Sequence, residues 1–139
     1  VYTATYRVQD AAGNDAAASG FAVVPHDRHG TTDPLWISVA ETTDGTTVAW
    51  SPADGAVSYN GIRGTLSSIR DAGPVIDLGP VQCIEANSLD TSTAGHGDPE
   101  TPSPGEAFFY VVEYNDGTST SYGSESADKP RAPGSGGCP

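Results

Sequence analysis

Residues 46–64 read TTVAWSPADGAVSYNGIRG, and this stretch decides the fold. Val48 and Trp50 alternate with small or polar residues, which predicts a strand with one buried face. The next six residues, SPADGA, favour a turn because Pro fixes φ and Gly allows a positive φ. A second extended run follows, carries Tyr59 on its inner face and ends at Gly64. The stretch therefore predicts two strands joined by a turn, with a tryptophan and a tyrosine in the core.

The clearest alternation elsewhere lies at residues 108–114, FFYVVEY, which predicts another half-buried strand. Asn-Asp-Gly at residues 115–117 indicates a hairpin turn, and a last strand is expected over 119–127. Residues 35–40 suit the first strand of this unit because Leu, Ile and Val alternate there. The remaining expectations are a strand over 65–69, short extended pieces over 75–77 and 81–84, and a long Pro-rich loop over 93–105.

The Trp-bearing strand, the Pro/Asp/Gly turn and the Tyr-bearing strand resemble strands B and C of a fibronectin type III domain. Tyr110 matches the position of the tyrosine corner in such sandwiches, and Gly123–Ser126, read as GSES, resembles the family's last strand. The resemblance covers about residues 34–131. It implies an all-β protein with an immunoglobulin-like, fibronectin type III β-sandwich, which we assign to residues 35–131.

Residues 1–24 predict a β-hairpin that precedes this sandwich, and residues 25–34 read as a polar linker. The hairpin resembles the last two strands of a bacterial immunoglobulin-like domain, and a start inside a strand suggests a longer polypeptide. A lone hairpin is marginal in water, so it is expected to pack against its own sandwich, a preceding part of the chain or a neighbouring subunit. The residues expected to make this contact are Tyr2, Tyr6, Val8, Phe21 and Val23.

Charge restricts the classes of partner. The formal net charge is −12, from 18 acidic and 6 basic residues, and such a surface repels nucleic acid and anionic lipid. No apolar run approaches the ~20 residues of a membrane helix, so membrane insertion is not expected. A single lysine among many Asp, Thr, Ser and Gly favours an extracellular protein on a bacterial surface.

Two cysteines, Cys83 and Cys138, suggest a disulfide that tethers a C-terminal tail at residues 132–139. The chain-entropy model assigns such a bond about 4 kcal/mol at most. The alternative is two unrelated thiols.

Metal chemistry has weak support in the sequence. Histidines 26, 29 and 96 are too few and too scattered for a convergent site. Two groups of oxygen-bearing side chains leave a Ca²⁺ site open as an alternative to ordinary turn chemistry. The first group is Asp10, Asn14 and Asp15, and the second is Asp90, Asp98 and Glu100.

No nucleophile, zinc-protease or phosphate-loop motif is present, so we expect no enzymatic activity. Trp36 and Phe109 lie off the apolar faces of their strands. Each is expected to contact another domain or subunit, or alternatively to stack against a carbohydrate.

Two hypotheses of function follow. The first is a non-enzymatic extracellular structural or adhesive protein, such as a filament subunit that self-associates by β-strand packing. The second is an accessory module of a secreted hydrolase, acting as a spacer or a weak carbohydrate-binding unit. A rod stiffened by Ca²⁺ is a third and weaker interpretation.

Overall fold

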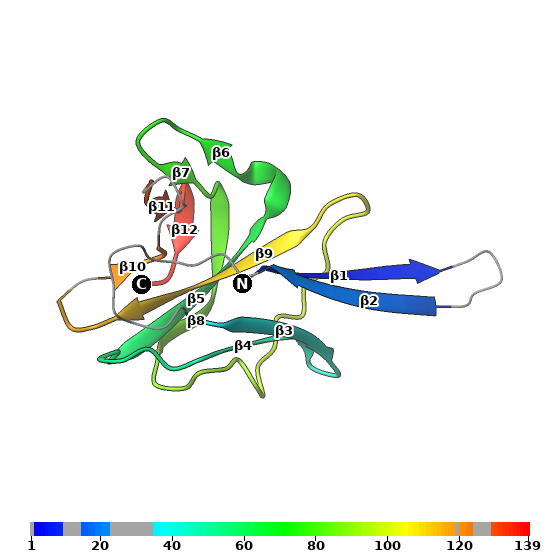
Figure 1. Ribbon diagram of the computed structural model, residues 1–139, viewed down its shortest axis with the longest axis horizontal. Coiled ribbons are helices and arrows are strands. Elements are labelled where there is room, and N and C mark those ends of the chain that lie inside the picture. Colours follow the sequence, from blue (N-terminus) through cyan, green and yellow to red (C-terminus); the bar gives the residue numbers. More distant parts are fainter. Residues whose placement is uncertain (1, 10–14, 23–34, 119, 124–128) are drawn as a thin grey trace.

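The chain is an all-β protein. The computed structural model describes residues 2–9, 15–22, 35–118, 120–123 and 129–139 (Figure 1). The strands are β1 (Tyr2–Gln9), β2 (Asp15–Ala22), β3 (Ile37–Thr42), β4 (Gly45–Trp50), β5 (Ser58–Thr65), β6 (Arg70–Asp71), β7 (Ile76–Asp77), β8 (Pro80–Ser88), β9 (Phe108–Asn115), β10 (Thr120–Ser121), β11 (Arg131–Ala132) and β12 (Ser135–Gly137). The only helical element among the described residues is a 3₁₀ turn, η1 (Leu66–Ser68). Within the same residues, no helix has the length and apolar character needed to cross a membrane.

Two antiparallel pairs open the chain. β1 pairs with β2 in a regular register that runs from Tyr2↔Ala22 to Gln9↔Asp15, so the expected N-terminal hairpin is confirmed. β3 pairs with β4, with Ile37 opposite Trp50 at one end. The apolar positions of both β3 and β4 point to one face, as their period-2 pattern predicts.

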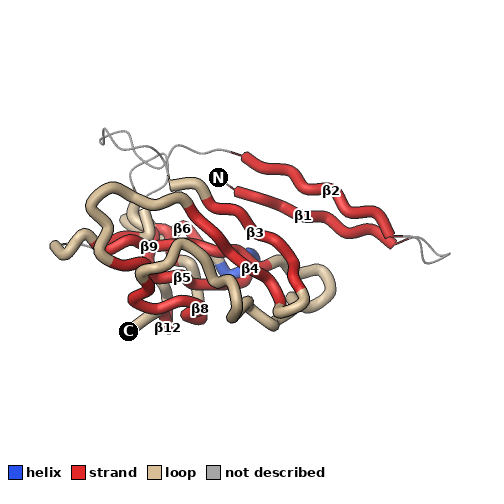
Figure 2. Tube along the Cα trace, turned by 90° about the horizontal axis from the view of Figure 1, so that it is seen from below, coloured by secondary structure: helices blue, strands red, loops and turns tan. Residues whose placement is uncertain are grey.

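A five-stranded sheet with the order β10-β9-β5-β8-β12 forms the largest layer. β5 pairs with β9 along its whole length, from Ser58↔Asn115 to Thr65↔Phe108. β8 lies on the other side of β5, with shifts of register around Gly61. Figures 1 and 2 show this sheet crossing the middle of the molecule, with β3 and β4 packed against one face.

Residues 91–98 run along β4 as an irregular third strand. The amide and carbonyl groups of Thr46 and Asp98 exchange two hydrogen bonds of 2.8 Å each, and Trp50 donates its amide to Thr91. Thr93 is 1 % exposed; its amide donates to the Val48 carbonyl, and its hydroxyl accepts the Val48 amide at 3.0 Å. The predicted loop over 93–105 indeed contains no regular strand, but its first part is bound to β4, where the Thr93 hydroxyl replaces part of the regular ladder.

The main core lies between β4 and the five-stranded sheet. Its buried members are Val48, Trp50, Tyr59 and Val112. The rings of Trp50 and Tyr59 meet at 5.6 Å between centroids, and the Tyr59 hydroxyl accepts the Ala53 amide at 2.8 Å. The inward tryptophan and tyrosine predicted from the sequence are thus confirmed, and the hydrogen bond fixes the turn between their strands.

The opposite face of the five-stranded sheet is also covered. Ile62 is fully buried, and its place in the alternation of β5 puts it on the face away from Tyr59. A small sheet with the order β11-β7-β6 lies on this side (Figure 1), and Leu78, directly after β7, is 2 % exposed. This second layer of burial is not a feature that the alternation patterns predicted.

The expected strand over 65–69 is wrong. The chain forms η1 there, closed by the Ile69 amide, which donates to the Leu66 carbonyl at 3.3 Å. Two consecutive serines favour such a local turn because their hydroxyls compete with strand pairing. The Ser67 hydroxyl donates to Glu106 at 2.6 Å and holds the turn in place.

The C-terminal segment adds strands rather than only a tether. Cys83 and Cys138 form the expected disulfide, while β12 pairs in parallel with β8 and β11 pairs in parallel with β7. At Gly136, φ is +76°, and a Cβ would lie 2.1 Å from the Val81 carbonyl oxygen, so only glycine fits against β8. β11 thus crosses the boundary expected after residue 131. Of the strand expected over 119–127, β10 is present, whereas residues 119 and 124–128 lie outside the described residues.

Core truncation tests this arrangement. Trp50→Ala is expected to lower the free energy of unfolding by about 3–5 kcal/mol, because it leaves a large cavity between the sheets. Trp50→Phe is expected to lower it far less, since the indole Nε1 has no hydrogen-bond partner among the described residues. Urea unfolding followed by circular dichroism measures both. Equal losses for the two variants would contradict this account of the core.

Candidate interaction surface

The hairpin is the first element of a candidate interaction surface. Figures 1 and 2 show β1 beside β3, with the far end of the hairpin projecting past the sheets. β1 and β3 nevertheless belong to different sheets, so no ladder of hydrogen bonds joins them. Of the predicted contact residues, Tyr2, Tyr6 and Val8 lie on β1, Phe21 lies on β2, and Val23 lies outside the described residues.

β3 supplies the second element. In the described part of the chain, β3 is hydrogen-bonded only to β4, so its other edge, beside β1, carries no ladder of hydrogen bonds. Ser38 and Ala40 are exposed on this strand. A regular six-residue edge of this kind is a template for pairing with another strand.

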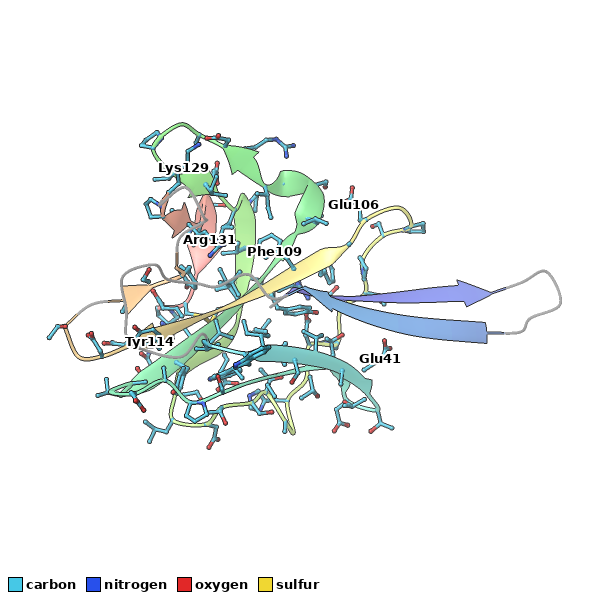
Figure 3. All side chains as sticks on the ribbon, viewed as in Figure 1. Glu41, Glu106, Phe109, Tyr114, Lys129 and Arg131 are labelled. Carbon is cyan, nitrogen blue, oxygen red and sulfur yellow. A yellow bond between two sulfur atoms is a disulfide. The ribbon has the colours of Figure 1, made fainter. Side chains whose placement is uncertain are left out.

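The two aromatic residues predicted to contact a partner, Trp36 and Phe109, differ in how accessible their side chains are. Trp36 is 48 % exposed, while its backbone is fixed by hydrogen bonds with Ser51. Phe109 packs its ring over Gly64, where a Cβ would lie 2.3 Å from Cζ, and Figure 3 shows it on the side of β9 away from β3. Trp36 is therefore the more available of the two for a partner.

A buried carboxylate links the two large layers. Asp98 is 6 % exposed and is held to β4 through its backbone. Its Oδ1 accepts a hydrogen bond from Arg63 Nη1 of β5 at 2.5 Å, and its Oδ2 accepts one from the Tyr110 hydroxyl of β9 at 3.0 Å. One side chain thus joins the third strand of one sheet to two strands of the other, and we call these three residues the Asp98 clamp.

Arg63 is itself held from several directions. Its Nη2 donates to Gln82 at 2.5 Å, and its guanidinium lies 4.6 Å from the centre of the Phe108 ring. The Arg63 side chain is 11 % exposed. Removal of Asp98 would therefore leave a largely buried cation without its counter-ion, which lowers the stability of the folded state.

The clamp alters the chemistry of Tyr110. Burial raises the pKa of its hydroxyl to about 12, and the negative charge of Asp98 adds to the rise, while a hydrogen bond with Thr46 opposes it. In a tyrosine corner, the tyrosine hydroxyl hydrogen bonds to nearby backbone. The partner is instead the carboxylate of Asp98.

A second polar cluster lies on the opposite face of the five-stranded sheet. Glu113 of β9 is 7 % exposed and accepts a hydrogen bond from Asn60 Nδ2 at 2.9 Å, while Asn60 Oδ1 accepts the Asn87 amide at 2.8 Å. Burial, followed by the charge of Glu113, raises the pKa of Tyr122 to about 12. Asn87 also reaches the carbonyl of Pro139 at 3.5 Å, so the cluster holds the chain's last residue.

Of the two predicted groups of Ca²⁺ candidates, only the second, Asp90, Asp98 and Glu100, lies among the described side chains, and there it forms no metal site. Asp10 and Asn14 lie outside the described residues, and Asp15 begins β2. Asp98 is occupied by the clamp, and in the portion that the structure describes no three His, Cys, Asp or Glu side chains group in a way that would hold a metal ion. His96 instead hydrogen bonds with the carboxylate of Glu85.

No protein-family model matches the chain, and no curated protein or solved structure matches it either.

The clamp is testable by a neutral replacement. Asp98→Asn is expected to lower the free energy of unfolding by about 3 kcal/mol or more, because Arg63 loses its buried counter-ion. Asp71→Asn is the matched control: it removes the exposed ion pair of 2.5 Å between Asp71 and Lys129 and should have a smaller effect. Chemical unfolding at neutral pH measures both. A loss for Asp98→Asn no larger than for the control would show that the clamp is unimportant.

The two half-buried tyrosines, Tyr110 and Tyr122, predict alkaline behaviour. A hydroxyl whose pKa is about 12 in the folded chain and about 10 when unfolded stabilises the fold fully below pH 10 and loses that contribution as pH rises to 12. Absorbance at 295 nm should therefore show late ionisation that Tyr110→Phe and Tyr122→Phe each reduce. Ionisation of all six tyrosines near pH 10 in the folded protein would contradict the burial of these two hydroxyls.

Proposed function

We propose that the chain is a non-enzymatic extracellular structural or adhesive protein that assembles through β-strand packing between neighbours. The observation that carries the proposal is the combination of a projecting two-stranded hairpin with an edge of β3 that has no hydrogen-bonded strand among the described residues. A hairpin alone is marginally stable in water, and an unpaired strand edge leaves backbone hydrogen-bonding groups without partners. Pairing the hairpin of one copy with the β3 edge of a neighbour would stabilise the first and supply hydrogen bonds to the second.

The proposal includes a fibronectin type III-like sandwich for residues 35–131. Its support is the strand order: β3, β4 and residues 91–98 follow the arrangement of strands A, B and E, and β8, β5, β9 and β10 follow that of C′, C, F and G. The parallel strand β12 and the small β11-β7-β6 sheet are additions to that pattern.

An extracellular location is the environment that fits the covalent chemistry. The Cys83–Cys138 disulfide is compatible with an oxidising compartment, where such bonds persist. The net charge of −12 would keep a surface protein soluble and would repel anionic lipid headgroups.

Trp36 supports the alternative proposal, an accessory carbohydrate-binding or spacer module of a secreted hydrolase. Its indole is 48 % exposed, and exposed aromatic side chains stack well on sugar rings. In that case, binding to an insoluble polysaccharide would disappear in Trp36→Ala and persist in Leu66→Ala, which changes an exposed side chain elsewhere.

Assembly is tested on the full chain by light scattering over a range of concentrations, with negative-stain microscopy of the same samples. The expected result is particles heavier than the 14.2 kDa monomer, with repeating units at high concentration. Ala40→Lys should shift the population towards the monomer, because a lysine on an exposed edge strand opposes pairing.

Thr101→Lys is the matched control for this substitution. It adds the same charge at an exposed position in the 99–107 loop and should leave assembly unchanged. A monomer at every concentration would overturn the filament proposal, and equal effects of the two lysines would show that net charge, rather than the β3 edge, controls assembly.

A further inference from the structure

The exposed apolar side chains are concentrated at one end of the sheets. Five large hydrophobic residues are exposed among the described residues, and four of them are Trp36, Val57, Leu89 and Tyr114. Their exposed fractions are 48 %, 54 %, 83 % and 37 %. The fifth, Leu66, lies at the other end, directly after β5.

Backbone pairing places these four residues together. Trp36 precedes β3 and hydrogen bonds with Ser51, which follows β4. The Val57 amide donates to the Asn115 carbonyl at 2.7 Å, beside Tyr114. Tyr114 and Ser88 both pair with Tyr59, and Leu89 comes directly after Ser88. The Trp50–Tyr59 contact then brings the two sheets together at this same end.

We call this surface the apolar end and define it as residues 35–36, 51–57, 89–90 and 114–118. It contains three exposed acidic residues, Asp54, Asp90 and Asp116, and no lysine or arginine. Figure 3 shows Tyr114 at this end, whereas Glu41 and Glu106 lie towards the opposite one. Monomeric proteins rarely leave large apolar side chains grouped in this way unless the patch binds something.

We propose that the apolar end binds a partner protein through a segment that carries both apolar and basic side chains. Apolar groups of the partner would cover Trp36, Val57 and Leu89, with Trp36 as the main anchor. Lysine or arginine side chains on either side would meet Asp54 and Asp90, and this complementarity gives orientation and a faster association. A second copy of the chain fits this end poorly, because it would bring the same aspartates against those of the first copy.

This binding site does not depend on the proposed assembly. The hairpin and the edge of β3 at Ala40 lie outside the apolar end, and Ala40→Lys leaves every residue of that end unchanged. Failure of one proposal is therefore distinguishable from failure of the other: assembly is measured by light scattering, and this site is measured by peptide binding.

The test uses the full chain and three short peptides, of alternating leucine and lysine, leucine and glutamate, and serine and lysine. Fluorescence anisotropy should detect binding of the leucine–lysine peptide only. The double variant Trp36→Ser/Leu89→Ser should weaken it by about tenfold or more, because it removes the anchor and its most exposed neighbour. Leu66→Ser, which removes an exposed apolar side chain at the opposite end, should leave the Kd unchanged.

The charges have their own control. Asp54→Asn/Asp90→Asn should weaken the leucine–lysine peptide, and Asp44→Asn/Glu41→Gln, which removes two exposed charges at the other end, should have a smaller effect. A rise in NaCl from about 50 mM to about 500 mM should weaken binding, because the contact between exposed charges is screened.

Several results would overturn the proposal. Unchanged Kd values for Trp36→Ser/Leu89→Ser, or equal binding of the serine–lysine peptide, would mean that only the net charge attracts the probe. Binding of a neutral oligosaccharide that is lost in Trp36→Ser would make this a sugar site. A concentration-dependent dimer that the same double variant abolishes would make it an interface between copies.

Discussion

The buried carboxylate of Asp98 is the interaction on which the arrangement of the two large layers depends. Its backbone pairs with Thr46 of β4, while its two carboxylate oxygens bind a guanidinium from β5 and a hydroxyl from β9. The net gain of a buried ion pair is modest, but removal of one partner is severe because the other charge stays buried. The contact therefore specifies how the two sheets pack and adds little net stability of its own.

The clamp and the aromatic pair hold opposite ends of the same core. Asp98 pairs with Thr46 near the start of β4, and Trp50 meets Tyr59 where β4 finishes. The first end closes with polar contacts, whereas the second leaves Trp36 and Leu89 exposed beside aspartates. One end of the sheets is therefore closed by buried polar contacts, and the other end exposes apolar side chains. The proposed partner site lies at this second end.

The sequence was sufficient for the parts of the fold that rest on local periodicity. Alternation at Val48 and Trp50 and again over 108–114 predicted β4 and β9, and a Pro/Asp/Gly turn predicted the connection from β4 to β5. Cysteine count and context predicted the disulfide. Strands and turns of this kind can be predicted because the pattern that specifies each of them lies within its own few residues.

Long-range contacts were not predictable in the same way. Asp98 was noted only as one of several loop acids, because its partners Arg63 and Tyr110 are distant in sequence and 91–98 has no strand periodicity. The glycine-rich β12 was missed for a related reason: its fit depends on close approach to Val81, not on side-chain pattern. Ser67 and Ser68 favour a turn at 66–68, but the apolar residues Leu66 and Ile69 on either side led to the prediction of a strand there. The apolar end was likewise not predictable, because only the register of strand pairing shows that its four exposed apolar residues lie at the same end of the sheets.

Native-state hydrogen exchange tests the central claim most directly, because it reports on individual backbone amides in the intact chain. If Asp98 fixes residues 91–98 to β4, the amides of Thr46, Thr93 and Asp98 should exchange as slowly as that of Ile62 in the five-stranded sheet. They should then open only with global unfolding. Exchange of the Thr46 and Asp98 amides orders of magnitude faster than that of Ile62 would mean that this segment opens on its own and that the clamp does not hold the two layers together.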